Sequence, residues 1–279
     1  WLQVSSEVAK KARFVHYDLI FADILKELGG FDLIVGNPPW AKPNWNEGQV
    51  LADLDPLYAG LSASDAKKVM SEALSKSRAT SEFLEVYSLT KGAMQVTSSE
   101  IMNTLVGGGS NTLYRCFMDL TFRLVSPLGY VALIHQDGHL TSSSSNRIRR
   151  AWYERVVKHF HFRNEIKNKL FSEIGNTTEF SINVYRGASG NVSFEQFTRA
   201  FLPNQIEESY DQKTIPGFQT SIVAPDGKWD TRGHKNRIIN INISTLNTIH
   251  KLTENDQGIL EEARFIQPFT ENTIRIFKI

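Results

Sequence analysis

The sequence lacks several features that define large classes of proteins. Cys116 is the one cysteine among 279 residues, which excludes a disulfide framework and a cysteine metal site. The seven histidines show no metal-ligand spacing. His159 and His161 are neighbours on a predicted strand, where both are expected to be structural. We therefore expect no metal site.

Long apolar runs and a strong charge of one sign are also missing. No apolar run reaches the roughly 18 residues that a membrane-spanning helix needs, and no signal peptide is present. We expect a cytoplasmic protein without a membrane partner. The formal net charge is +1, so any surface for nucleic acid has to come from local patches. With 41% hydrophobic residues, the chain can bury one large core or two smaller ones.

The most informative segment is FDLIVGNPPW, residues 31–40. Its apolar first half predicts a strand that is covered on both faces, as in a parallel α/β sheet. Gly36 and the two prolines cannot extend such a strand. Residues 37–40 should therefore lie at the carboxyl edge of the sheet, where ligands bind in open α/β folds.

The Asn-Pro-Pro-Trp tetrapeptide suggests a reaction. The exocyclic amine of a nucleobase is a poor nucleophile, because its lone pair is delocalised into the ring, and it needs acceptors for its two hydrogens. The Asn37 side-chain oxygen is one acceptor, and Pro38 and Pro39 preset the direction of a second, the Pro38 carbonyl. Trp40 offers a flat face for a flipped-out base. The alternative is a Pro-Pro turn followed by a core tryptophan.

This segment resembles the catalytic strand and loop of S-adenosylmethionine-dependent amino-methyltransferases, and more narrowly those of N6-adenine DNA methyltransferases with NPPY or NPPW. The resemblance covers residues 14–185. It implies that Asn37, Pro38, Pro39 and Trp40 form the catalytic loop, and that Gly36 and Asn37 border the cofactor, S-adenosylmethionine. Glutamine methyltransferases that act on release factors also carry NPPY, so the tetrapeptide alone does not choose the substrate.

The residues before this segment fit a cofactor site. Residues 13–17 predict a short strand that ends at Asp18, and a predicted helix over residues 19–28 is stopped by two glycines. In the family that the chain resembles, an acidic residue at the end of the preceding strand binds the adenine part of the cofactor. Asp18 holds that place better than Asp23, which lies inside the predicted helix. Either aspartate could instead be a helix cap.

The residues after the tetrapeptide continue the pattern. Apolar residues at positions 113, 117, 120 and 124 predict one face of a helix. A turn at Pro127 and Gly129 and a buried strand over residues 130–135 follow. Gln136 and Asp137 come directly after that strand and are candidates for the substrate pocket, although a polar loop is the commoner explanation.

Residues 146–159 predict a second amphipathic helix with a basic face. Arg149 and Arg150 on that face are candidates for contacts with DNA phosphates, with a solvated basic face as the alternative. Residues 159–166 and 179–185 predict two strands, and their short connection favours antiparallel pairing. Phe180 resembles the aromatic residue that packs on the other face of the flipped base, and a core phenylalanine is the alternative.

Two features depart from the family pattern. The chain begins at Trp1 and carries no Gly-rich loop after a first strand, so we expect the sheet to be incomplete at the amino end and cofactor binding to be weak. Residues 41–110 form an insertion with a predicted helix over residues 63–89 and a hinge candidate at residues 107–110. Such an insertion could close over DNA as a lid. It resembles the large adenine methyltransferases of type IIG, BREX and DISARM systems.

We therefore expect an α/β fold: a Rossmann-like methyltransferase sheet with an antiparallel last strand over residues 1–185, and the start of an α+β target-recognition or accessory region over residues 186–279. The expected reaction is methyl transfer from S-adenosylmethionine to N6 of a flipped-out adenine in double-stranded DNA, within a restriction-modification or phage-defence system. Other subunits of a defence complex are further candidate partners. An RNA base amino-methyltransferase and a catalytically silent DNA-binding subunit remain as alternatives.

Overall fold

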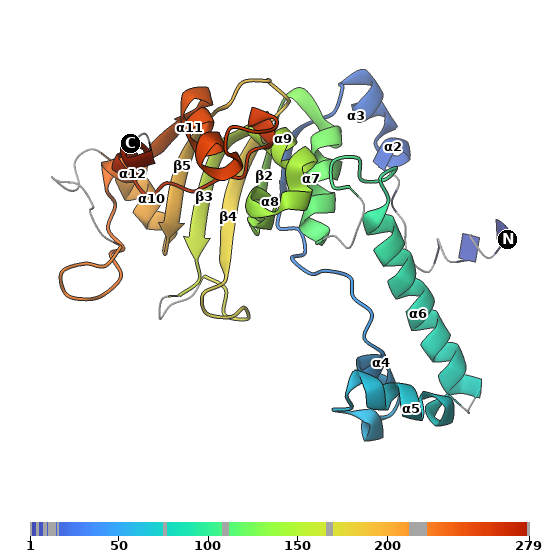
Figure 1. The fold of residues 1–279 in the computed structure, drawn as a ribbon. Coiled ribbons are helices and arrows are strands. Elements are labelled where there is room, and N and C mark those ends of the chain that lie inside the picture. Colours follow the sequence, from blue (N-terminus) through green and yellow to red (C-terminus); the bar gives the residue numbers. More distant parts are fainter. Residues whose placement is uncertain are drawn as a thin grey trace.

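The computed structural model describes residues 17–74, 77–107, 112–165, 170–211 and 222–277, with residues 2, 3, 6, 7, 10 and 15 before them. A six-stranded sheet of order β1-β2-β4-β3-β5-β6 forms the body of this part of the chain. A helical arm extends away from the sheet (Figure 1). No helix among the described residues is long and apolar enough to cross a membrane.

The strand directions place four strand ends at one edge of the sheet. β1 (Phe31–Gly36) is parallel to β2 (Val125–His135). β4 (Glu179–Arg186) is antiparallel to both β2 and β3 (Val156–Arg163) and lies between them. β5 (Ser193–Ala200) is parallel to β3, and β6 (Ile239–Asn242) is antiparallel to β5. This is the predicted Rossmann-like α/β sheet, and β1, β2, β3 and β5 share one carboxyl edge.

The antiparallel last strand predicted for residues 1–185 is confirmed as β4. β5 and β6 extend the sheet beyond β3, and they carry the buried side chains of Phe194, Phe197 and Ile241. The sheet therefore continues across residue 186. The division into catalytic and recognition regions at that residue stays a prediction.

β1 differs from its prediction in burial. The strand forms as expected, but it stands at the end of the described sheet. Leu33 is 63% exposed and Val35 is 71% exposed, so the expectation of an apolar cover on both faces is wrong. Alternate residues of a strand point to opposite faces. Leu33 and Val35 therefore share a face with Phe31, whose ring contacts that of Phe21 at 5.2 Å.

Helices cover the two faces of the sheet unequally. The larger apolar cluster includes buried residues of α7 (Leu113–Leu124), α8 (Gly138–Thr141), α9 (Asn146–Tyr153) and α11 (Ile243–Glu254). The smaller cluster, on the opposite face, includes Phe162, Phe180, Phe197 and Ile206 of α10 (Pro203–Tyr210). Trp40 packs against this smaller cluster. Short 3-10 turns are η1 (Pro56–Tyr58), η2 (Ser143–Ser145), η3 (Lys235–Arg237) and η4 (Leu260–Glu262).

The predicted helix over residues 146–159 is correct only in its first half. α9 ends at Tyr153 and β3 begins at Val156. The stripe of Ile148, Trp152 and Val156 is buried as expected, but it crosses from a helix into a strand. β3 is paired on both sides, and these ladder hydrogen bonds override the local helical pattern.

The amino-terminal prediction is corrected in part. α2 (Tyr17–Ile20) and α3 (Ala22–Glu27) confirm the predicted helix with a break at Phe21. Most of the predicted strand over residues 13–17 lies outside the described residues. Its last residue, Tyr17, belongs to a helix, so a strand end at Asp18 is wrong.

Residues 262–268, which we call the strap, cross over α8 and α9. The Phe265 amide donates to the Leu140 carbonyl at 2.9 Å, and the Tyr153 hydroxyl donates to the Ala263 carbonyl at 3.0 Å. At its far end, the Pro268 carbonyl accepts from the Thr198 hydroxyl at 2.8 Å. α12 (Glu271–Phe277) follows the strap.

The arm consists of α4 (Glu47–Leu54), α5 (Ala63–Ala73) and α6 (Ser77–Ser98). The helix predicted over residues 63–89 is thus confirmed, with a break between α5 and α6. Three of the four residues of the predicted hinge, residues 108–110, lie outside the described residues. Leu51, Ala66 and Phe83 are the buried residues of a small apolar cluster in the arm.

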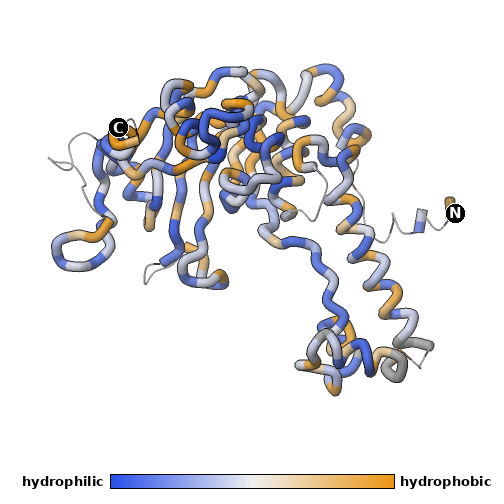
Figure 2. The backbone as a smooth tube through the Cα atoms, viewed as in Figure 1, coloured by the Kyte–Doolittle hydropathy of each residue, from blue (hydrophilic) through white to orange (hydrophobic). Residues whose placement is uncertain are grey.

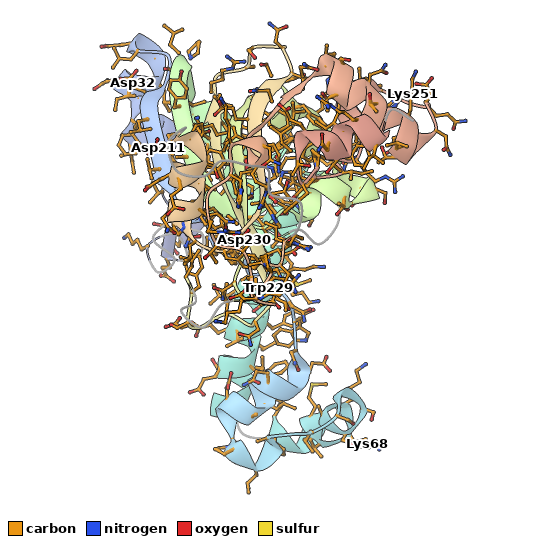
Figure 3. The ribbon with its side chains drawn as sticks, turned by 90° about the vertical axis from the view of Figure 1, so that its left-hand side faces the viewer. Asp32, Lys68, Asp211, Trp229, Asp230 and Lys251 are labelled. Atoms are coloured by element: carbon orange, nitrogen blue, oxygen red, sulfur yellow. The ribbon has the colours of Figure 1, made fainter. Side chains whose placement is uncertain are left out.

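The surface of the arm is mixed in character. Apolar and polar segments alternate along α6 (Figure 2), where Leu89 and Val96 are 52% and 54% exposed. Figure 3 shows Lys68 of the arm and Lys251 of α11 at opposite ends of the molecule. In Figure 1 the arrowheads of β3 and β5 point toward the side on which α4 and α5 lie. The arm therefore extends past the carboxyl edge of the sheet.

Candidate functional site

The tetrapeptide lies at the carboxyl end of β1, where the sequence predicts it. β1 ends at Gly36, Asn37 is exposed and Pro38 is buried. Among the residues that the structure describes, none hydrogen-bonds the Asn37 side chain. The next residue after the tetrapeptide, Ala41, accepts a 2.9 Å hydrogen bond from the Leu113 amide at the start of α7. The loop is therefore anchored beyond Trp40, while the Asn37 carboxamide stays available to a ligand.

Trp40 and Phe180 lie together, although they come from distant parts of the sequence. Their ring centroids are 5.5 Å apart and their planes differ by 29°. The Trp40 indole N–H donates to the Ile134 carbonyl at 3.2 Å, which ties the ring to the end of β2. A third ring, that of Phe171, contacts both, at 5.6 Å from Trp40 and 5.0 Å from Phe180. The sequence pattern gives no sign of Phe171, because it lies in an irregular loop.

A cleft of about 450 Å³ lies beside the tetrapeptide. Gly36, Asn37, Pro38 and Pro39 line it, together with Phe21 and side chains of α2, β1, α7 and β2. Tyr17 and Phe21 supply aromatic rings, stacked on each other at 5.9 Å. The described residues that line the cleft include no charged side chain.

This lining fits part of S-adenosylmethionine. Flat apolar walls suit the adenine ring of the cofactor, whereas its sulfonium and its charged amino-acid end find no charged partner in the described lining. Asp18 and Asp23, predicted to bind the cofactor, are exposed in the first turns of α2 and α3 and do not line the cleft. Of the predicted cofactor residues, only Gly36 and Asn37 border it.

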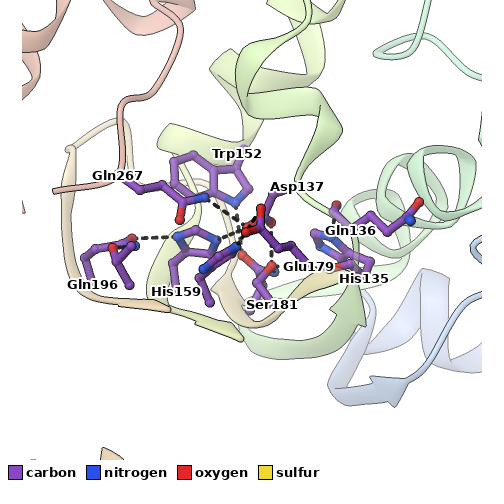
Figure 4. Close-up of polar contacts among 12 residues, drawn as sticks. His135, Gln136, Asp137, Trp152, His159, Glu179, Ser181, Gln196 and Gln267 are labelled. Carbon is purple, nitrogen blue, oxygen red and sulfur yellow. Dashed lines mark hydrogen bonds and ion pairs between the residues drawn. The ribbon is translucent and has the colours of Figure 1, made fainter. Parts of the chain in front are cut away.

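Asp137, predicted as a pocket residue, is instead engaged in a buried polar network (Figure 4). Its Oδ2 accepts from His159 Nε2 at 2.9 Å and from Gln267 Nε2 at 3.2 Å, and its Oδ1 accepts from the Ser181 hydroxyl at 2.5 Å. Burial alone raises the pKa of the Asp137 carboxyl, but the charge and hydrogen bond of His159 outweigh burial and hold that pKa below its usual value.

His159 is held between two acceptors. Its Nδ1 lies 2.6 Å from Gln196 Oε1. The Gln196 amide nitrogen donates to the Thr198 hydroxyl, which donates to the Pro268 carbonyl in the strap. That chain turns the Gln196 oxygen toward Nδ1 of His159. His159 and Asp137 are thus joined by a hydrogen bond within the buried network.

The network makes Asp137 a connector between elements. It joins the end of β2 to β3, β4 and the strap, and its oxygens are already occupied by three donors. The side chain of its neighbour Gln136 points away from Asp137 (Figure 4). Of the two predicted pocket residues, Gln136 is the one with a free side chain among the described residues.

His135, Asp137 and His139 offer ligand atoms that lie within 4.8 Å of one another. His135 already uses Nδ1 with the Gln136 carbonyl at 2.9 Å and Nε2 with the Tyr185 hydroxyl at 2.7 Å. Within the described residues, the buried ring nitrogens of His139 have no hydrogen-bond partner. Burial lowers the pKa of His135 to about 4 and that of His139 well below its usual value. A metal ion here would have to displace several of these bonds, and we assign none.

The two candidate DNA-contacting arginines lie in different surroundings. Arg149 is 3% exposed, and its guanidinium donates to the carbonyls of Glu262 at 2.8 Å, His139 at 2.9 Å and Ser142 at 2.8 Å. A phosphate contact by Arg149 is therefore wrong, because this face of α9 lies under the strap. Arg150 has a side chain that is 51% exposed and pairs with Glu154 at 3.2 Å, and its phosphate contact stays a prediction.

Comparisons with known proteins give only remote similarities. No family model and no curated protein matches the chain. Among solved structures, the methyltransferase subunit of a type I restriction-modification system from Streptococcus thermophilus is similar with a TM-score of 0.31 and 13% identity, over 62% of this chain and 27% of that one. The DNA-bound type ISP restriction-modification enzyme LlaBIII is similar with a TM-score of 0.29 and 13% identity, over 60% of this chain and 10% of that one.

A nuclease-deletion mutant of the type ISP enzyme LlaGI, in complex with a DNA substrate mimic, gives a TM-score of 0.30 and 14% identity, over 61% of this chain. This chain thus spans 27%, 10% and 12% of the length of the three proteins. Similarity at this level carries no argument about function. What the chain does has to be argued from its own residues.

Proposed function

We propose that this chain contributes the catalytic loop and base pocket of a DNA methyltransferase that methylates N6 of a flipped-out adenine, using S-adenosylmethionine. The observation that supports this most is the position of residues 37–40. They follow β1 at the carboxyl edge of the sheet, with the apolar cleft on one side and the Trp40–Phe180 pair near by.

In this mechanism Asn37 and Pro38 act as acceptors. The Asn37 side-chain oxygen and the Pro38 carbonyl bind the two hydrogens of the adenine amine, which draws its lone pair out of the ring. The bound cofactor supplies an electrophilic methyl group. No side-chain base is required before transfer, because the nitrogen becomes acidic only once it is methylated and its proton can then leave to water. Catalysis rests on positioning.

Trp40 supplies the stacking surface for the base. Base stacking on an aromatic side chain is worth about 1–3 kcal/mol, which offsets part of the cost of flipping the nucleotide out of a duplex. The hydrogen bond from the Trp40 indole to Ile134 holds this surface in a fixed orientation. Phe180 lies on rigid β4 and limits the pocket on the other side of the Trp40 ring.

DNA as the substrate is supported by what flanks this edge. The arm and the segment around residues 222–234 both extend beyond the sheet on the side of the carboxyl ends (Figure 1). In that segment Trp229 is 37% exposed and stacks on Phe201 at 5.1 Å. Two extensions on one side of a base pocket fit a duplex substrate within a restriction-modification or phage-defence system. Other subunits of such a system are proposed partners.

One observation favours a second candidate, a catalytically silent DNA-binding subunit. The cleft offers no charged partner to the amino-acid end of the cofactor within its described lining, and both candidate aspartates lie outside it. A protein that keeps the fold but binds no cofactor would have this lining.

The test is methyl transfer by the protein in its natural full-length form. With tritiated cofactor and mixed-sequence duplex DNA, we expect incorporation by the unaltered protein and N6-methyladenine in the digested product. Asn37→Ala should reduce incorporation by about a hundredfold or more, comparable to the loss of one preorganised polar group in other active sites. Asp32→Ala, an exposed change in the same strand, is the matched control.

The outcomes separate the alternatives. Equal incorporation into an RNA duplex would favour the RNA methyltransferase, and duplex binding without incorporation would favour the silent subunit. Near-normal activity of Asn37→Ala would refute the proposed acceptor role.

A further inference from the structure

A loop between β3 and β4 brings a third aromatic ring to the Trp40–Phe180 pair. The Phe171 ring meets Trp40 at an interplanar angle of 73° and Phe180 at 79°, so it stands edge-on to both. The three rings belong to one apolar cluster on the face of the sheet that carries Trp40. We call these three residues the aromatic box.

Asn164 at the end of β3 holds this ring in place. Its side-chain amide donates to the Phe171 carbonyl at 2.8 Å, and its side-chain oxygen accepts from the Phe171 amide at 3.2 Å. The Asn164 main-chain amide donates to the Thr178 carbonyl at 3.0 Å. Asn164 is 1% exposed. It thus binds Phe171 through both main-chain groups, as a neighbouring strand would.

The loop also stores strain. Thr177 has φ of 70°, and a β-branched residue in the left-handed region is a conformational outlier. Such conformations persist where the surrounding contacts over-determine them, and they cluster at functional sites. Here the hydrogen bonds of Asn164 and the contacts of Phe171 supply that constraint. The main chain therefore keeps an energetically unfavourable conformation in the loop that places the Phe171 ring against Trp40.

The spacing within the box bears on how a base enters. A base inserted between two rings needs them about 7 Å apart, twice the ~3.4 Å between stacked bases, whereas Trp40 and Phe180 are 5.5 Å apart. A flipped base must therefore part these two rings or stack on the open face of Trp40. In either case the edge of Phe171 touches both rings and limits how far they move.

We propose that Phe171 is the third wall of the base pocket and that Asn164 is the positioning residue that holds it there. This inference rests on the proposed function, because it concerns the same site. Phe171 contacts the base and steadies Trp40, and Asn164 acts only through Phe171. The ligand class is a flipped purine in duplex DNA.

The experiment measures base capture without requiring methyl transfer. The full-length protein is titrated into a pool of duplexes in which 2-aminopurine, opposite an abasic position, stands between randomised flanks. Fluorescence of 2-aminopurine reports the unstacked base. Phe171→Ala should weaken capture about tenfold, since two edge-on aromatic contacts are lost. Phe171→Tyr should restore it, and Asn164→Asp, which keeps the acceptor but loses the donor, should fall between.

Glu173→Ala, an exposed change in the same loop, is the matched control and should equal the unaltered protein. Urea unfolding of each variant shows whether weaker capture comes from a destabilised fold or from the loss of the Phe171 contact. In methylation assays, Phe171→Ala should raise the KM for DNA about tenfold and leave kcat within about twofold.

The two proposals can fail separately. The protein could capture the base in a way that depends on Phe171 and yet transfer no methyl group. That result would refute the proposed reaction and support the proposed role of Phe171. If Phe171→Ala captures the probe with the same affinity as Glu173→Ala, the proposed role of Phe171 as a wall of the pocket is refuted, whether or not methyl transfer occurs. A lack of any signal from the unaltered protein overturns it as well.

Discussion

Replacing Arg149 with alanine should destabilise the fold strongly and leave the intrinsic affinity for DNA unchanged. The guanidinium satisfies three carbonyls, of which that of His139 is buried and those of Ser142 and Glu262 are partly buried. Leaving a buried acceptor without a donor costs about 1–3 kcal/mol. We take about 2 kcal/mol for the His139 carbonyl and about 1 kcal/mol for each of the Ser142 and Glu262 carbonyls. The free energy of unfolding should then decrease by about 4 kcal/mol.

A loss of that size should lower the melting temperature by about 10 °C in a chain of this length. Urea unfolding at pH 7 measures it as a shift of the midpoint with an unchanged slope. Hydrogen exchange should show faster exchange of the Phe265 amide, because Arg149 anchors the strap at Glu262. Arg150→Ala, the next residue of α9 with a half-exposed side chain, is the matched control and should cost less than about 1 kcal/mol.

The refuting result is specific. If Arg149→Ala unfolds like the unaltered protein, and the salt dependence of its DNA binding flattens by about one unit, Arg149 is a phosphate contact after all. The burial argument would then be wrong.

Two further predictions concern pH and the arm. Burial lowers the pKa of His135 from 6.5 to about 4 in the folded protein. The free energy of unfolding should therefore be highest above pH 6.5 and should decrease by about 3 kcal/mol as the pH falls toward 4. For His135→Asn, unfolding measured at several pH values should show a weaker dependence of stability on pH. A pH profile identical to that of the unaltered protein would contradict this. Residues 63–73 and 77–98 of the arm should exchange amide hydrogens more slowly when duplex DNA is added to the full-length protein. Equal protection with and without DNA would mean that the arm is a fixed structural subdomain.

The sequence predicts most of the strands around the site, because their signals are local. The apolar run before Asn37 and the alternation around Ile182 need no knowledge of the rest of the chain, and both form strands in the predicted places. The segment at residues 146–159 fails for the opposite reason. Its helical stripe is compatible with a strand in the second half, and pairing with β4 and β5 decides the outcome.

The site is predictable only where a short motif carries it. Asn37 to Trp40 are recognisable because the proposed chemistry needs those residues in that order. Phe171 and Asn164 have no such signature, since their relation is a tertiary contact in an irregular loop. The sequence wrongly indicates an exposed Arg149, because a helical projection places an arginine on the polar face of an amphipathic helix. Only the strap, more than a hundred residues away along the chain, reveals that it is covered.

The strap also sets an order of events during synthesis. Arg149 and Glu262 are separated by 113 residues, so the ribosome needs about 6–23 seconds to synthesise the segment between them. During that interval Arg149 Nε, the Leu140 carbonyl and the Tyr153 hydroxyl lack the strap groups that they bind in the folded protein. The layer over α8 and α9 can therefore be completed only after the strap has been synthesised.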